Sequence, residues 1–401
     1  MEQNGNPEPD EGARRTKIII VGAGMAGLSA AYHLTKNGVT DYRILEARGH
    51  VGGRIVQIPI GSERVELGAN WIHGVLGNPV YELAMQHGLV DIVSPPKPHK
   101  VVAATEQGKQ VPFAMLHEIY EAYLCFLKRC EEYFVSQYLP PEGIDSVGEH
   151  IKLEVNLYLD KIKDPAERHM RELLFECLLK RETCISGCDD MNEIDLLEIG
   201  SYTELQGGQH SAAERVQFHS RTFEEVMEVI PSENLLTRHP VKLIKWNCNR
   251  KSNSEDSDSD DSDRTVIESP SSSRESSCEK TLKRHNVEVI CDNGKRFLGD
   301  HVICTLPLGV LKHCAGSAFQ PALPDYKREA IDRLLFGTVD KILLEYDRPF
   351  LHPGITEVLL LWEGDPDGSD DVGKNWYRKI YSFAKITETL ILGWISGKEA
   401  E

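Results

Sequence analysis

The apolar and polar positions of this chain follow two periods, and together they predict a mixed α/β fold. A continuous apolar run at 18–21 is followed by a helical pattern through Leu34, and a second apolar run ends at Glu46. That order predicts a strand, a helix and a second strand, the βαβ unit of a parallel sheet.

Later segments predict further helices. Three consecutive segments, 115–138, 146–162 and 164–180, have apolar residues at helical spacing. The first ends before Pro140-Pro141. The second opens with the capping box Ser146-Val147-Gly148-Glu149, and the third opens with Asp164-Pro165. Shorter helices are expected at 78–88, 223–229 and 326–335. Residues 91–113 are expected to be irregular, because three prolines forbid a long helix there.

Alternating or continuous apolar runs predict the remaining strands. They are 65–67, 243–246, 287–291, 296–298, 301–305, 336–346, 358–362, 376–382 and 390–394. Asn293-Gly294 predicts a hairpin between two of them. Residues 249–284 are rich in serine and acidic residues and lack apolar ones, so they predict a disordered surface insertion. Its serines are candidate phosphorylation sites, and a merely tolerated loop is the alternative.

Composition limits the classes of partner. The net charge of −18 over 401 residues argues against nucleic acid and suits a cationic small molecule, with solubility alone as the alternative. The ten cysteines form no C-x-x-C pair and predict reduced thiols. We predict no metal site. No apolar run reaches membrane-spanning length, and residues 1–16 predict a disordered leader without a targeting signal, so a cytoplasmic or nuclear location is expected.

The predicted turn after the first strand has the chemistry of a dinucleotide site. Its glycines, Gly22, Gly24 and Gly27, follow the spacing G-x-G-x-x-G. They would allow a tight turn, approach of the backbone to a pyrophosphate, and close packing of helix on strand. Glu46, at the end of the second strand, would accept a hydrogen bond from a ribose hydroxyl. Gly52-Gly53-Arg54 suits a loop beside a phosphate, with an ordinary turn as the alternative.

Several motifs together resemble the flavin-dependent amine oxidases, and within them the animal polyamine oxidases. Besides the glycine turn they are ELGANWIHG at 66–74, LPLGVLK at 306–312 and FGTVDKILLEYDRPF at 336–350. The resemblance covers roughly residues 17–400 apart from the insertion. It implies FAD-dependent oxidation of spermine or N1-acetylated polyamines by hydride transfer to flavin. The products would be an aldehyde, a shorter amine and hydrogen peroxide, with molecular oxygen as the oxidant.

The resemblance also implies roles for individual residues. Lys341 would hold a water near flavin N5, and His73 would lie over the substrate-binding face; from spacing alone, a structural role is the alternative for both. The residues implied in cofactor binding are Gly22, Gly24, Gly27, Glu46, Gly53, Arg54, Gly68, Ala69, Trp71 and Val241.

The implied architecture is a Rossmann-like FAD-binding domain interleaved with an α+β substrate domain, which has a mixed sheet and a helical subdomain. The expected segments are a leader at 1–16, a FAD-binding region at 17–90, a mainly helical substrate part at 91–220, a return to the FAD-binding domain at 221–248 and 285–312, and a substrate-domain sheet at 313–401.

Two questions stay open on the sequence. The segment 376–379 and the later Gly393-Trp394-Ile395 are more similar to spermine oxidases. By contrast, Cys184-Ile185-Ser186-Gly187 is more similar to the acetylpolyamine enzymes. Family members are expected to continue for about another hundred residues with a second flavin-binding segment, which is missing here, so the chain is expected to be C-terminally truncated. The alternatives are a truncated non-catalytic flavoprotein, a partner-binding relative and a lysine demethylase-type amine oxidase. The oligomeric state is not predicted.

Overall fold

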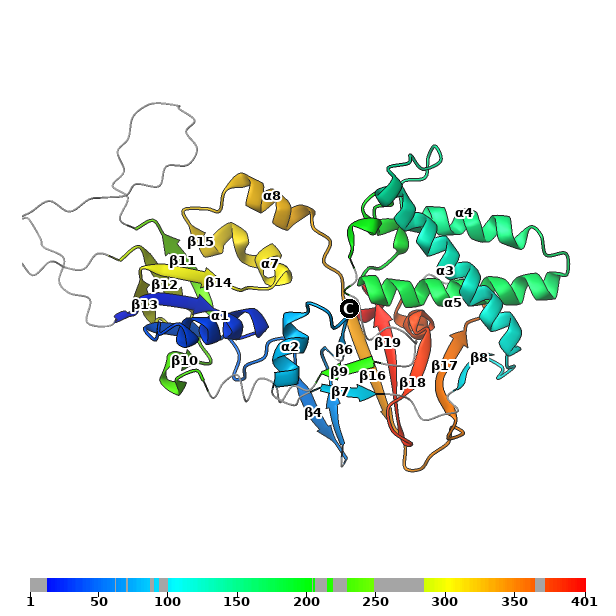
Figure 1. Ribbon diagram of the computed structural model, residues 1–401, viewed down its shortest axis with the longest axis horizontal. Coiled ribbons are helices and arrows are strands. Elements are labelled where there is room, and N and C mark those ends of the chain that lie inside the picture. Colours follow the sequence, from blue (N-terminus) through cyan, green and yellow to red (C-terminus); the bar gives the residue numbers. More distant parts are fainter. Residues whose placement is uncertain are drawn as a thin grey trace, which may run out of the picture. The chain divides into compact units, whose positions relative to one another are not determined.

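The computed structural model describes residues 13–61, 63–69, 71–86, 90–93, 100–203, 205, 215–218, 229–248, 285–364 and 372–401. The chain forms two compact units, each built from two separate stretches. Unit 1 comprises Met1–Val56 and Ser220–Arg333, and unit 2 comprises Gln57–His219 and Leu334–Glu401. Both units combine sheets with helices (Figure 1).

A parallel four-stranded sheet in unit 1 contains the predicted βαβ unit. Its strands, in spatial order, are β10 (Leu235–Leu236), β3 (Tyr42–Leu45), β2 (Ile18–Val21) and β14 (His301–Cys304). Helix α1 (Met25–Lys36) connects β2 to β3. Residues Ile19 and Ile20 of β2 are fully buried, which explains why this strand is a continuous apolar run.

The second sheet of unit 1 includes the predicted hairpin. Its order is β1 (Ala13–Arg15), β13 (Arg296–Gly299), β12 (Val287–Cys291), β11 (Val241–Trp246) and β15 (Phe319–Gln320). Gly294 turns β12 into β13 with φ 77°, a value that glycine adopts without steric cost. Apolar side chains of both sheets, including Val21 and Phe297, share one core.

Unit 2 is organised on a mixed five-stranded sheet. Its order is β16 (Val339–Glu345), β19 (Leu390–Ser396), β18 (Ser382–Lys385), β17 (Ile355–Leu361) and β8 (Lys100–Thr105). Two small sheets accompany it: the hairpin of β4 (Gln57–Ile60) and β5 (Glu63–Glu66), and the set of β6 (Trp71–Ile72), β9 (Arg215–Phe218) and β7 (Val90–Val93).

The three predicted helices are confirmed. They are α3 (Phe113–Ser136), α4 (Val147–Leu159) and α5 (Pro165–Ser186), and they lie beside one another over the large sheet (Figure 1). Ser146 and Glu149 form the predicted capping box, and the Asp164 side chain accepts from the Glu167 N–H. Helix α2 (Pro79–Gln86) begins as predicted, with Asn78 Oδ1 accepting from the N–H of Val80 at 3.0 Å.

The structure corrects three local predictions. Residues 91–113 are not irregular throughout, because β7 and β8 lie there and β8 pairs in parallel with β17. The predicted strand 376–382 is instead a 3₁₀ turn, η4 (Trp376–Lys379), and the strand begins only at Ser382. Helix α7 (Leu308–Ala318) follows Pro307, in a segment where no helix was predicted. Helix α8 (Asp325–Arg333), in contrast, lies where a helix was predicted.

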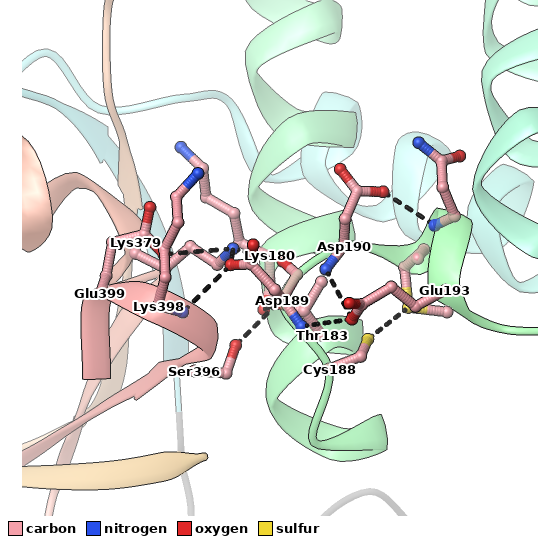
Figure 2. A network of polar contacts seen from close by, with 12 residues as sticks. Lys180, Thr183, Cys188, Asp189, Asp190, Glu193, Lys379, Ser396, Lys398 and Glu399 are labelled. Atoms are coloured by element: carbon pink, nitrogen blue, oxygen red, sulfur yellow. Dashed lines mark hydrogen bonds and ion pairs between the residues drawn. The ribbon is translucent and has the colours of Figure 1, made fainter. Parts of the chain in front are cut away.

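Tertiary contacts explain the 3₁₀ turn. Lys379 Nζ donates to the Asp189 carbonyl at 2.6 Å and lies 3.5 Å from Asp189 Oδ1 and 3.7 Å from Glu399 Oε2 (Figure 2). The backbone N–H of Lys398 donates to the same Asp189 carboxylate, and these contacts keep the pKa of Asp189 below its ordinary value against the opposing effect of burial. The network therefore joins the end of α5 to η4 and to the turn η5 (Gly397–Ala400).

The compact units divide the chain at different places from the predicted domains. Residues 57–90 belong to unit 2, because β4 to β7 form their own small sheets and do not join the parallel sheet. Residues 313–333 belong to unit 1, because α7 contacts β11 and α8 contacts α7. The predicted insertion 249–284, the predicted leader up to residue 12 and the predicted helix up to residue 228 lie outside the described residues.

The described residues contain neither a membrane-spanning helix nor a metal-binding cluster. No helix there is long and apolar enough to cross a membrane. No three His, Cys, Asp or Glu side chains in the same residues are grouped so that they could hold a metal ion. The nine described cysteines are all free thiols, and burial raises the pKa of Cys130 and Cys177 to about 12, so these two are neutral and unreactive.

The capping box gives a prediction about stability. Ser146→Ala removes the acceptor for the Glu149 N–H at the start of α4, so the free energy of unfolding should fall by about 1 kcal/mol. Urea unfolding of unit 2 measures this. Ser136→Ala, at the exposed end of α3, is the matched control and should leave stability within about 0.5 kcal/mol of the wild type. An equal loss in both variants would contradict the assignment of the cap.

Candidate active site

The glycine turn of unit 1 is closed so tightly that side chains are excluded. A Cβ atom on Gly27 would lie 1.9 Å from the Gly22 carbonyl oxygen, so only glycine allows α1 to begin this close to the end of β2. Gly22 has φ 101° and faces Thr305, whose hydroxyl donates to the Val21 carbonyl at 2.7 Å. Gly24 is the N-cap of α1, and no side chain caps the helix. The first N–H groups of α1 therefore point out of the turn, as an anion site requires.

Glu46 lies directly against this turn. Its carboxylate accepts from the Ala23 N–H and from the Arg48 N–H, each at 2.8 Å, and the side chain is 7% exposed. The acidic residue predicted to bind a ribose is thus fixed at the carboxyl ends of β2 and β3, where parallel sheets bind nucleotides.

The loop Gly52-Gly53-Arg54 also packs on the turn. The Gly52 N–H donates to the Ala23 carbonyl at 2.8 Å, and Gly52 and Gly24 form an isolated parallel bridge. A Cβ atom on Gly53 would lie 3.3 Å from the Gly24 Cα, while Arg54 is exposed. The structure therefore brings the two predicted glycine motifs together.

Val241 opens β11, one strand of the second sheet of unit 1, and is half-buried. The segment that precedes it continues alongside the end of β3. Glu46 N–H donates to the Leu236 carbonyl at 2.9 Å, and His239 N–H donates back to the Glu46 carbonyl at 2.8 Å. The segment that leads into Val241 is therefore hydrogen-bonded to Glu46, the residue directly after β3.

Unit 2 holds the other group of predicted residues. Lys341 lies on β16. Its ammonium group donates to the carbonyl of Glu66, the last residue of β5, at 3.2 Å and also to the Gly68 carbonyl. The Nζ atom lies 4.9 Å from the centre of the Trp394 ring, directly across the strand pair. Lys341 thus joins β16, β19 and the ELG stretch.

Burial shifts the protonation of this lysine. It lowers the pKa of Lys341 to about 8, and the nearby Glu66 carboxylate opposes the shift. The amine is therefore neutral in part of the molecules at neutral to mildly basic pH. Such a group can accept a proton as well as orient a water.

The remaining predicted residues lie along the same stretch of unit 2. Ala69 is exposed after Gly68, Trp71 is in β6, and His73 is exposed in the loop before α2, where Asn78 Nδ2 donates to its carbonyl at 3.3 Å. Gly74 adopts φ 73° and packs against Leu205. The stretch 66–74 therefore supplies carbonyl acceptors to Lys341 and an exposed imidazole.

Two residues at these sites were not predicted. Thr305 closes the glycine turn, and its position directly after β14 was the available signal. Trp394 faces Lys341, which could be found only once the register of β16 on β19 was known. No periodicity in the sequence fixes that register.

With the geometry described, comparison with known proteins is informative. The profile of the family described as "Flavin containing amine oxidoreductase" matches residues 25–182 and 268–401, more than half of the chain. This chain belongs to that family. It is 28% identical over 422 residues to the human "Peroxisomal N(1)-acetyl-spermine/spermidine oxidase", covering 100% of this chain and 76% of the human protein. It is 25% identical over 434 residues to the rice (Oryza sativa subsp. japonica) "Polyamine oxidase 1", covering 97% of this chain and 75% of the rice protein.

The fold agrees with solved relatives. A putrescine oxidase double mutant from a redesign of cofactor binding matches with a TM-score of 0.62 at 14% sequence identity, covering 97% of this chain and 77% of that one. The predicted α/β architecture of flavin amine oxidases is therefore confirmed. The family match confirms the flavin cofactor. The turn fits FAD, because its closed glycines, uncapped helix N-terminus and buried Glu46 match what the ADP end of a dinucleotide requires.

The packing of Gly27 predicts an effect on both stability and flavin binding. Gly27→Ala places a methyl group against the Gly22 carbonyl, so α1 must move away from β2, and both stability and FAD affinity should fall. We expect a loss of about 1–3 kcal/mol in unfolding free energy. Gly316→Ala, in the exposed part of α7 where a Cβ atom meets nothing, is the control and should gain about 1 kcal/mol. Unchanged thermal unfolding in Gly27→Ala would contradict the packing.

The pKa of Lys341 predicts how stability depends on pH. Between about pH 8 and its ordinary pKa of 10.5, the unfolded chain binds more protons at this residue, so the wild type gains stability as pH rises. Relative to Lys341→Met, the wild type should therefore become progressively more stable across this window, and the difference should be flat below it. Urea unfolding at several pH values measures this, with Lys128→Met on the exposed face of α3 as the matched lysine replacement. A difference that shrinks with rising pH would contradict the shift.

Proposed function

We propose that this protein oxidises polyamines, either spermine or N1-acetylated polyamines, to an aldehyde and a shorter amine with release of hydrogen peroxide. The observation that carries the proposal is the match to the human peroxisomal N(1)-acetyl-spermine/spermidine oxidase along the whole of this chain. The net charge of −18 is consistent with a polycationic substrate, since an acidic surface raises the local concentration of cations.

The residues of unit 1 would hold the cofactor by its ADP end. The N-terminus of α1 and the glycines of the turn would bind the pyrophosphate, Glu46 the ribose, Arg54 a phosphate, and the Val241 backbone the adenine. When bound, FAD supplies a two-electron oxidant for the carbon beside an amine nitrogen.

The residues of unit 2 would act on the substrate. The reacting secondary amine must be neutral, because an ammonium has no lone pair with which to form the imine. Lys341 Nζ orients a water beside the flavin in this proposal, and with a pKa near 8 it can accept or return a proton there. The exposed imidazole of His73 would lie over the substrate-binding face, while Gly68, Ala69 and Trp71 would contribute to cofactor binding.

The choice between the two substrate classes rests on two segments of unit 2. Cys184-Ile185-Ser186-Gly187 forms the end of α5, with Ile185 64% exposed, and an apolar side chain there suits an acetyl group. The segment 376–379 is held against this end through the contacts of Lys379 with Asp189. Both segments therefore belong to one structural assembly, and substrate preference is a property of the pair.

Peroxide production tests the proposal. The FAD-loaded protein is mixed in air with spermine, N1-acetylspermine, spermidine or putrescine, and peroxide is followed with a coupled peroxidase. We expect peroxide with spermine or N1-acetylspermine at rates well above those with putrescine. Lys341→Met should leave flavin reduction by substrate largely intact and slow the reoxidation by oxygen.

The outcomes separate the alternatives. A methylated-lysine peptide is added as a fifth substrate. Peroxide from this peptide and from none of the polyamines would indicate a demethylase-type amine oxidase instead. Bound flavin without peroxide from any of these amines would overturn the proposal in favour of a non-catalytic or partner-binding flavoprotein. If the flavin of Lys341→Met is reoxidised at the wild-type rate, Lys341 has only a structural role.

A further inference from the structure

Arg238 is held in a backbone conformation that arginine rarely adopts. Its φ is 58°, in the left-handed region, where only two other non-glycine residues of the described chain lie, Gln137 and Asn247. This region is unfavourable for residues with a Cβ atom, and such residues concentrate at functional sites. Gln137 follows the end of α3, where a left-handed residue ends many helices. Arg238 ends no helix.

Backbone hydrogen bonds fix Arg238 in place. Its N–H donates to the Arg48 carbonyl at 2.9 Å, and the N–H of the next residue, His239, donates to the Glu46 carbonyl at 2.8 Å. Asn293 Nδ2 donates to the Arg238 carbonyl at 3.3 Å. The left-handed turn therefore lies against the residues that follow β3.

The side chain of Arg238 covers the chain just beyond Glu46. A Cβ atom built on Gly49 would lie 3.4 Å from Arg238 Nε, 3.5 Å from Nη2 and 3.8 Å from Cζ, so the guanidinium group lies over Gly49. Arg238 is exposed, and within the described part of the chain its guanidinium has no ion pair with a carboxylate. A planar cation is thus presented to solvent beside Glu46, at the carboxyl end of β3.

This position is where a dinucleotide would place its adenosine. Ligands of parallel sheets bind beyond the carboxyl ends of the strands, and Glu46 marks the ribose end of that site. A guanidinium plane stacks well on an aromatic ring such as a purine. Lysine, a point charge on a flexible stem, cannot reproduce that contact.

We propose that Arg238 forms part of the binding site for the adenosine end of the cofactor, with its guanidinium plane stacked on the adenine ring. The inference rests on the assignment of FAD to this chain. It adds a residue outside the glycine turn, the Gly52-Gly53-Arg54 loop and Val241, and it explains why the left-handed backbone at position 238 carries an arginine in place of a glycine.

Binding and stability should respond in opposite directions when Arg238 is replaced. In Arg238→Gly the backbone strain is relieved, so the flavin-free protein should unfold at the same or a higher temperature, while the dissociation constant for FAD should rise about tenfold. Arg238→Lys should weaken FAD binding to a similar degree. Gln137→Gly, the matched control, relieves the same kind of strain in unit 2 and should leave FAD affinity unchanged.

ADP isolates the adenosine end of the cofactor. Competition of ADP against FAD should weaken by the same factor in Arg238→Gly as FAD binding itself. Unchanged FAD affinity in Arg238→Gly, or weaker FAD binding with ADP competition intact, would overturn the inference and leave the FAD assignment standing. A wild-type protein that binds no FAD would overturn both.

Discussion

The packing of Gly27 on the Gly22 carbonyl is the contact on which the glycine turn of unit 1 depends. Because a methyl group at residue 27 would lie 1.9 Å from that oxygen, α1 can begin at the end of β2 only while the position is glycine. The N-cap residue is Gly24, so no side chain caps the helix N-terminus that packs here. The same turn also brings the Ala23 N–H within 2.8 Å of Glu46. The proposed phosphate and ribose contacts would thus both depend on this one close packing contact.

Lys341 has the corresponding role in unit 2. A lysine on a sheet strand ordinarily extends to solvent, but this one turns onto the carbonyls of Glu66 and Gly68 and lies over Trp394. The same contacts that join three segments of the unit also bury the amine and lower its pKa. If Lys341 has the proposed role beside the flavin, its replacement should affect both stability and turnover.

Local signals predicted the parts of the fold that local physics controls. The glycine turn, the capping box at Ser146, the Asp164 cap and the Asn293-Gly294 hairpin each depend on residues adjacent in sequence, and each was predicted correctly. The 3₁₀ turn at 376–379 was not, because Lys379 bonds to Asp189, which lies far away in sequence. The division of 57–90 from the parallel sheet also depends on strand pairings that no local pattern specifies.

The same distinction applies to the candidate site. The spacing of Gly22, Gly24 and Gly27 and the acid at Glu46 are sufficient to predict a dinucleotide turn, whereas the roles of Lys341 and His73 came only from resemblance. The conformation of Arg238 and the contact of Trp394 with Lys341 were found only in the structure, because they depend on backbone conformation and on strand register. Membership of the family specifies a flavin cofactor. It does not specify which amine is the substrate, which experiment must determine.

Titration of the flavin-free protein with FAD, with FMN in parallel, tests most directly whether unit 1 binds the cofactor by its ADP end. Calorimetry should give one FAD per chain, much weaker binding of FMN, which lacks the adenosine, and displacement of FAD by ADP. Equal affinity for FAD and FMN, or no binding of either, would contradict the assignment of the glycine turn and Glu46 to the cofactor.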